Sequence, residues 1–227
     1  MIKIIFYSII AILGVTSGHC QTADHYYSLG NTMSDQQNFQ GAIQAYSIAI
    51  QLDSRYYDAY YNRGIAKMNI NDFTGAIVDF ASAFNINPMH VDAYLNSGVA
   101  KSYLKDYSGA INDFSWVIKI RPKYVVAYNN RGQIKDFIHD YKGAINDYNW
   151  ALWLDPMNTT AYVNRGVVKG EQLNYPGAIE DFSKALIIDP KIAAAYFNRG
   201  MAKIKINQIK SGKEDLFIAK SLGYSLE

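Results

Sequence analysis

The chain has very little cysteine and no strong charge of either sign. Cys20 is the only cysteine in 227 residues, so no internal disulfide framework holds this protein together. Lysine and arginine exceed aspartate and glutamate by a net charge of only +2, which gives no electrostatic case for nucleic-acid binding. We therefore expect neither a disulfide-rich fold nor a nucleic-acid partner.

Residues typical of catalytic and metal sites are also sparse. The four histidines form no pair with each other or with cysteine at metal-ligand spacing; they are His19, His25, His90 and His139. The glycines do not cluster as a phosphate-binding loop requires. We expect no catalytic residue, no metal, no small-molecule cofactor and no enzymatic activity.

One apolar run stands apart from the rest of the chain, at its N-terminus. Lys3 is followed by the uncharged segment Ile4–Val15 and then by the small residues Thr16, Ser17 and Gly18. Twelve residues are too few to span a bilayer as a typical helix. A basic start, an apolar middle and a small-residue exit predict a secretory signal peptide over residues 1–20, cleaved after Cys20 or after Gly18.

Two alternatives to a cleaved leader remain open. Cys20 is a candidate for the lipid-modified cysteine of a lipoprotein, but the preceding residue is normally small and here it is His19. In the second alternative, the leader is not cleaved and stays on the protein as a membrane anchor. We favour cleavage, and hence a secreted or periplasmic protein of the cell envelope. Membrane contact is expected only through the leader or a lipid on Cys20.

The rest of the chain is dominated by a strict repeat. Glycine recurs every 34 residues without a gap, at Gly30, Gly64, Gly98, Gly132, Gly166 and Gly200. Four residues before each glycine stands a tyrosine: Tyr26, Tyr60, Tyr94, Tyr128, Tyr162 and Tyr196. Self-similarity at this period is typical of helix–turn–helix arrays.

The second half of each unit has its own markers. Twelve residues after the glycine stand Ala42, Ala76, Ala110, Ala144, Ala178 and Gly212. Sixteen after it stand Tyr46, Phe80, Phe114, Tyr148, Phe182 and Leu216. Steps of three and four place such residues on one helix face. Prolines close most units, at Pro88, Pro122, Pro156 and Pro190, and proline ends a helix. Two antiparallel helices per unit bury their apolar faces only by stacking on neighbours.

These residues resemble the tetratricopeptide repeat family. Tyr60–Ala66, Asp72–Phe80 and Asn87–Pro88 match its pattern at nearly every marker, and the resemblance covers residues 23–224. It implies an all-α fold, a right-handed α-solenoid of six repeats at about 23–56, 57–90, 91–124, 125–158, 159–192 and 193–226. It also implies that the first helices line a concave groove that usually binds a peptide or another protein.

Comparison of the copies predicts an ion cluster between the two helices of repeats two to six. One residue before the glycine stand Leu29, Arg63, Ser97, Arg131, Arg165 and Arg199. Three after it stand Met33, Lys67, Lys101, Lys135, Lys169 and Lys203, and fifteen after it stand Ala45, Asp79, Asp113, Asp147, Asp181 and Asp215. All three positions become apolar together in repeat one. The alternative is a set of separate, solvated charges.

The resemblance places a row of asparagines in the groove, two residues before the glycine: Asn62, Asn96, Asn130, Asn164 and Asn198. An amide donates and accepts at once, which suits a peptide backbone. The alternative is that these residues cap or bridge neighbouring helices. Aspartates such as Asp58 and Asp92 stand where carboxylate-binding relatives have lysine or arginine, so that ligand class is not expected.

The two halves of the expected groove differ in chemistry. The first half has polar side chains, at Tyr27, Tyr61, Asn31 and Asp35, and the second has apolar ones, at Phe137, Val163, Val167, Phe197 and Met201. The sequence predicts a ligand with a basic or amine-bearing end and an apolar end.

A second candidate contact patch consists of Trp116, Trp150 and Trp153 on second helices. Exposed aromatic patches often mark contacts, although these residues would equally cover the outer core.

The sequence predicts two alternative functions. The first is a non-enzymatic scaffold or adaptor that binds an extended peptide or partner protein in the groove. The alternative is a structural component of a cell-envelope assembly, held through its convex face or ends.

Overall fold

The structure, a computed structural model, describes residues 22–224 as twelve α-helices and no strand. The predicted leader and Cys20 lie outside the described residues. The helices are α2 (Ala23–Asp35), α3 (Phe39–Leu52), α4 (Tyr57–Asn69), α5 (Phe73–Ile86), α6 (Val91–Tyr103), α7 (Tyr107–Ile120), α8 (Val125–Phe137), α9 (Tyr141–Leu154), α10 (Thr159–Glu171), α11 (Tyr175–Ile188), α12 (Ala193–Lys205) and α13 (Ile209–Ser221).

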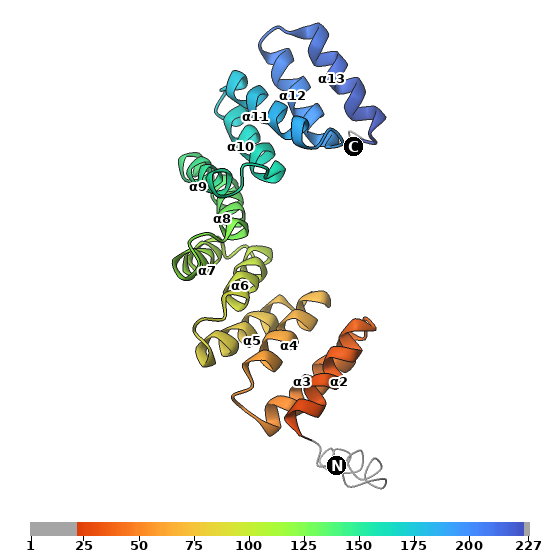
Figure 1. Ribbon diagram of the computed structural model, residues 1–227, viewed down its shortest axis with the longest axis vertical. Coiled ribbons are helices and arrows are strands. Elements are labelled where there is room, and N and C mark those ends of the chain that lie inside the picture. Colours follow the sequence, from red (N-terminus) through yellow and green to blue (C-terminus); the bar gives the residue numbers. More distant parts are fainter. Residues whose placement is uncertain (1–21, 225–227) are drawn as a thin grey trace.

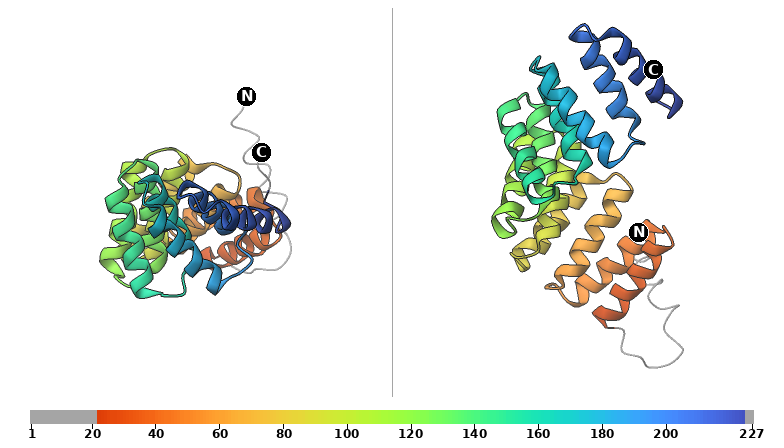
Figure 2. Two further views of the ribbon diagram at one scale, coloured as in Figure 1. Left: turned by 90° about the horizontal axis from the view of Figure 1, so that it is seen from above. Right: turned by 45° about the horizontal axis from the view of Figure 1, so that its top comes forward.

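The helices form six antiparallel pairs that stack into a curved solenoid (Figures 1 and 2). Each pair contacts the next through its second helix, as α3 does with α4. Successive first helices also contact one another, from α2 and α4 through to α10 and α12. Because the first helices approach one another in this way, they line the inner, concave side. The all-helical solenoid expected from the sequence is confirmed.

The recurring glycine lets a second-helix ring lie against the backbone of the first helix. A Cβ atom at Gly132 would stand 2.8 Å from Cε1 of Tyr148, and one at Gly64 would stand 2.6 Å from Cε1 of Phe80. No side chain at the glycine position would fit between the first helix and this ring. In repeat six the ring is replaced by Leu216, and the two backbones approach instead, since a Cβ at Gly200 would meet the Gly212 carbonyl oxygen at 2.8 Å.

Two glycine-to-alanine changes are expected to have opposite effects on stability. Gly132→Ala should lower the free energy of unfolding by about 1–3 kcal/mol, because the new methyl group collides with Tyr148. Gly170→Ala should raise it by about 1 kcal/mol, because alanine favours the helix and the nearest atom to its Cβ, on Ala178, is 4.0 Å away. Urea denaturation of both variants measures the difference, and equal effects would refute this account of the glycine.

The turn between the two helices of a pair is built by the same device in every repeat. Seven residues after each marker glycine, a non-glycine residue has a positive φ: Gln37, Asn71, Lys105, His139, Leu173 and Asn207. The next backbone N–H bonds back to the first helix, as Asp72 does to the Lys67 carbonyl at 2.9 Å. This is a Schellman ending. In repeats one to five the following helix is capped by a side chain, as when Asp72 Oδ1 accepts from Gly75 N at 2.9 Å, whereas Gln208 of repeat six gives no such cap.

The predicted inter-helix ion cluster is confirmed. In repeat four, Asp147 is fully buried, and its two oxygens bind Arg131 Nη2 at 2.6 Å and Lys135 Nζ at 2.9 Å. Repeats two, five and six have the same arrangement around Asp79, Asp181 and Asp215. Repeat three keeps the lysine and replaces the arginine by Ser97, whose hydroxyl donates to Asp113 at 2.6 Å.

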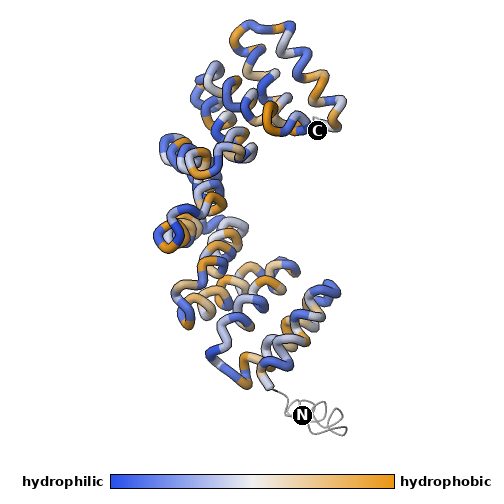
Figure 3. Tube along the Cα trace, in the orientation of Figure 1, coloured by the Kyte–Doolittle hydropathy of each residue, from blue (hydrophilic) through white to orange (hydrophobic). Residues whose placement is uncertain are grey.

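Hydrophobic and hydrophilic residues alternate along every helix (Figure 3). None of the helices described over residues 22–224 is long and apolar enough to cross a membrane.

Candidate functional site

The concave face has three hollows, each between the first helices of consecutive repeats. They measure about 280 Å³ between repeats two and three, about 300 Å³ between repeats three and four, and about 250 Å³ between repeats five and six. Each is lined by one member of the asparagine row: Asn96, Asn130 and Asn198 respectively. The five asparagines are all half-buried, so they lie at the floor of the groove rather than on its rim.

The structure divides the asparagine row into two parts. Asn62 donates to the Tyr27 hydroxyl at 3.0 Å, and Asn96 donates to the Tyr61 hydroxyl at 3.1 Å. These are bonds between neighbouring repeats, which is the bridging alternative left open by the sequence. Later repeats have Leu95, Asn129, Val163 and Phe197 at the tyrosine position. Because no tyrosine precedes Asn130, Asn164 or Asn198 at this position, those amides have no equivalent bond to a tyrosine of the preceding first helix.

The acidic residues of the first half are also engaged within the chain. Asp58 Oδ1 lies 3.8 Å from Nε2 of His90, and Asp92 Oδ1 accepts from the Tyr124 hydroxyl at 3.3 Å. Both aspartates are on first helices, and each partner belongs to the start of the next first helix. The role of Asp58 and Asp92 as contacts for a basic ligand stays a prediction. Such a ligand would compete with His90 and Tyr124 for these carboxylates.

A carboxylate pair occupies the groove between repeats four and five, where sequence analysis had assigned no site. Burial raises the pKa of Asp136 to about 6, and the neighbouring Glu171 carboxylate adds to the shift. Asp136 Oδ1 is buried and accepts no hydrogen bond from the described residues. The Tyr148 hydroxyl is also buried there, and burial followed by the Asp136 charge raises its pKa, against the lowering effect of the Asn164 amide. A cationic group from a ligand would satisfy this pair.

We expect Asp136→Asn to stabilise the protein at neutral pH. The folded-state pKa of Asp136 is above its unfolded value, so the carboxyl contributes a cost that grows as pH rises from about 4 to about 6. After allowance for solvent screening, removal of the charge should raise the free energy of unfolding by about 1 kcal/mol at pH 7. Denaturation at pH 7 and pH 4 tests this, since the gain should vanish at pH 4. The exposed carboxylate of Asp35 supplies the control, Asp35→Asn, with little change at either pH.

The hollow between repeats five and six is bordered by Gly170, which has no side chain to fill it. Apart from the Ala178 methyl group at 4.0 Å, nothing outside its own helix lies within 4 Å of the Cβ position of Gly170. The floor is apolar and includes Val167 and Met201, while Glu171 and Asn198 supply polar groups. Glu171 therefore belongs both to this hollow and to the carboxylate pair.

The tryptophan patch lies on second helices, away from the groove. Trp116, Trp150 and Trp153 are 47%, 45% and 70% exposed, so they do not form core. Trp116 stacks on Tyr94 and Trp150 stacks on Tyr128, which holds two of the three rings flat against the first helix. The patch is therefore available for contact.

No cluster of three or more metal-ligating side chains is found within residues 22–224. The groove features that sequence analysis missed all depend on contacts between different positions of adjacent repeats. The charge of Asp136 and Glu171 was visible in the sequence, but their proximity was not.

Comparisons with known proteins agree with this geometry. The profile of the family described as TPR repeat matches residues 30–71. A MamA structure is 23% identical, with a TM-score of 0.71 over 77% of this chain and 96% of that chain. YrrB, described as a TPR protein with an unusual peptide-binding site, is 18% identical, with a TM-score of 0.65 over 80% of this chain and 93% of its own. PilF of Pseudomonas aeruginosa is 14% identical, with a TM-score of 0.73 over 91% and 94%.

At these identities the structural likenesses establish the fold alone. No curated protein matches the sequence. The matched profile, the six helix pairs and the solved neighbours together define an α-solenoid of tetratricopeptide repeats. Residues 30–71 match the TPR repeat family, and residues 22–224 have the fold of a six-repeat solenoid of that kind.

Proposed function

We propose that this protein is a non-enzymatic scaffold that binds an extended segment of a partner protein in its concave groove. The observation that carries the proposal is the row of three hollows, each lined by an asparagine. The Asn96 amide donates to Tyr61 and to the Asp92 carbonyl, whereas Asn130 and Asn198 follow no tyrosine and offer amides that suit a peptide backbone. A structural neighbour, YrrB, is described as having a peptide-binding site, which supports the same class of function.

The chemistry of the groove indicates the kind of segment that fits. The hollow at Gly170 has an apolar floor that suits an aliphatic or aromatic side chain. Asp136 and Glu171 lie next to it and suit a lysine or arginine side chain of the partner. In repeats four to six the asparagines are not bound to a preceding tyrosine. The expected ligand therefore has an apolar and a basic residue close together, whereas the sequence had suggested that these features lie at opposite ends.

Site-specific photo-crosslinking tests this proposal. A photoreactive amino acid at Met201, which is 39% exposed and lines the Gly170 hollow, should capture the partner in native extracts. The matched control is the same amino acid at Ile187, which is 82% exposed on a second helix. Mass spectrometry of the crosslink then identifies the bound segment. Crosslinks at Ile187 and none at Met201 would contradict groove binding.

The tryptophan patch supports a second candidate function, a structural part of a cell-envelope assembly. Its three rings are exposed on the outer helices, and exposed aromatic patches often mark protein contacts. Photo-crosslinking from Trp153, which is 70% exposed, separates this function from the first. A partner captured at Trp153 rather than Met201 would favour the assembly role.

We further propose that the protein acts in the cell envelope or outside the cell. The support is the apolar N-terminal run after Lys3, which has the pattern of a secretory signal. An intact mass measurement on protein purified from the native envelope should correspond to loss of residues 1–20, or to loss of residues 1–18. A mass that includes the whole leader would contradict cleavage, and an added lipid on Cys20 would identify a lipoprotein.

A further inference from the structure

The junctions between repeats follow a pairing rule. In four of the five junctions, a serine or asparagine on a second helix accepts a hydrogen bond from the arginine of the next repeat, as Ser47 does from Arg63 at 3.0 Å and Ser115 does from Arg131 at 2.9 Å. At the remaining junction both positions change together, to Ala81 and Ser97. The two positions therefore vary as a pair.

The two open ends of the solenoid carry the same pair of positions. At the C-terminal end, the serine position is Phe217, which is 74% exposed. At the N-terminal end, the arginine position is Leu29. Both have become apolar, although they belong to opposite ends of the chain. Phe217 and Leu29 would meet only if repeat one of a second copy stacked on repeat six of the first.

The other end-face positions show the same complementarity. Inside the chain, Ile50 packs against Ala59 across a junction. At the open ends these positions are Lys220 and His25, so in a stacked pair of copies the His25 ring would face the flexible stem of Lys220 instead of a branched side chain. The side chain at the N-terminal end is larger than the interior alanine, and the side chain at the C-terminal end is more flexible than the interior isoleucine.

The charges of the ends are also opposite. Residues 23–56 carry Asp24, Asp35 and Asp53 against Arg55, a net charge of −2. Residues 193–226 carry six lysines and arginines against Glu214 and Asp215, a net charge of +4. Asp35 occupies a junction position, because its counterparts Tyr103 and Phe137 contact Phe73 and Tyr107 at the start of the preceding second helix. In a second copy it would lie beside the start of α13, where Lys210 and Lys213 stand.

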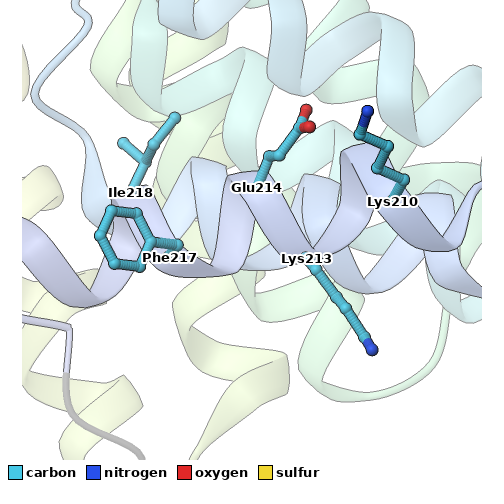
Figure 4. A pocket seen from close by; sticks show the side chains of 5 residues that line it. All are labelled: Lys210, Lys213, Glu214, Phe217 and Ile218. Carbon is cyan, nitrogen blue, oxygen red and sulfur yellow. The ribbon is translucent and has the colours of Figure 1, made fainter.

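The C-terminal face is open in the structure. Lys213 and Phe217, at the junction positions that Ile43 and Ser47 hold in repeat one, border a hollow of about 510 Å³ on α13 (Figure 4). Lys210, Glu214 and Ile218 complete its border, at positions that are mostly exposed on the outer side of the other repeats. From the paired substitutions, the opposite charges and this open face, we infer that the protein associates head to tail with a second copy of itself, with repeat one of one copy stacking on repeat six of another. Such a heterologous contact does not close, so it extends into short filaments.

Mixing of two differently blocked variants tests the inference. Phe217→Ser removes the exposed ring from the tail and leaves the head intact. Thr32→Lys adds bulk and charge to the head, at an exposed position whose counterparts Ala66 and Ala100 are buried by the preceding repeat. Both residues are exposed in the single chain, so folding should be unaffected, which circular dichroism verifies.

Sedimentation equilibrium gives the outcomes. The wild-type average mass should rise with concentration beyond that of a dimer. Each variant alone should stay monomeric, with an association constant at least about tenfold lower. An equimolar mixture should form a one-to-one dimer and nothing larger, because each variant retains one working face. A monomeric wild-type protein, unimpaired association of Phe217→Ser, or a mixture that does not pair would each overturn the inference.

Discussion

Asp147→Ala is expected to destabilise the protein by about 3 kcal/mol. The carboxylate is fully buried and binds Arg131 and Lys135 at the same time, so its removal leaves two cations of one helix face without a counter-charge. The repulsion between these cations, four residues apart, then adds to the loss of the ion pairs. Chemical denaturation, followed by far-ultraviolet circular dichroism, measures the change.

Two matched variants separate this effect from the loss of a generic aspartate. Asp113→Ala removes the same position in repeat three, where Lys101 is the one cation partner and Ser97 replaces the arginine, so the cost should be smaller. Asp35→Ala removes an exposed carboxylate and should change stability by less than about 0.5 kcal/mol. If all three variants had equal midpoints, the ion cluster would contribute nothing specific to stability.

Phe114→Ala is expected to cost about 3–5 kcal/mol. The ring is 1% exposed and lies against the first-helix backbone, where a Cβ at Gly98 would stand 2.7 Å from its Cε1 atom. The ring belongs to a buried cluster with Ala110 and Ile134, so truncation leaves a cavity at the helix interface. Because each repeat contacts only its neighbours, the damage in repeat three should also weaken coupling between the two halves, seen as a lower denaturant slope.

Trp153→Ala supplies the control for this prediction. It deletes a larger ring, but one that is 70% exposed, so we expect a loss below about 1 kcal/mol. A loss equal to that of Phe114→Ala would mean that ring size, rather than burial against the glycine, determines the cost.

Much of the fold could be predicted from the sequence because the six copies act as an alignment of one another. The 34-residue period, the recurrence of a glycine and of an aromatic residue sixteen positions later, and the joint change of Leu29, Met33 and Ala45 are each visible as a pattern of positions. The positive φ in the turn was not predictable in this way. It recurs at residues as different as Leu173 and His139, because the Schellman hydrogen bonds impose it regardless of side chain.

The groove was harder to predict, because its properties arise between repeats. Asn62 bonds to Tyr27 of the preceding repeat, so the availability of an asparagine depends on a residue 35 positions earlier. The Asp136–Glu171 pair joins two different positions of adjacent repeats and has no counterpart elsewhere in the chain. The hollow between repeats five and six is bordered by Gly170, a glycine outside the 34-residue series, and the open space beside it is known only from its surroundings.

The most direct test of groove binding is the affinity of the crosslinked partner segment for Gly170→Leu. Leucine favours the helix over glycine and fills the hollow, so the variant should be at least as stable as the wild type. Calorimetry should nevertheless show affinity lowered by about tenfold or more, because the apolar side chain of the ligand loses its site. Unchanged affinity in this folded variant would contradict the proposal that repeats five and six hold the partner.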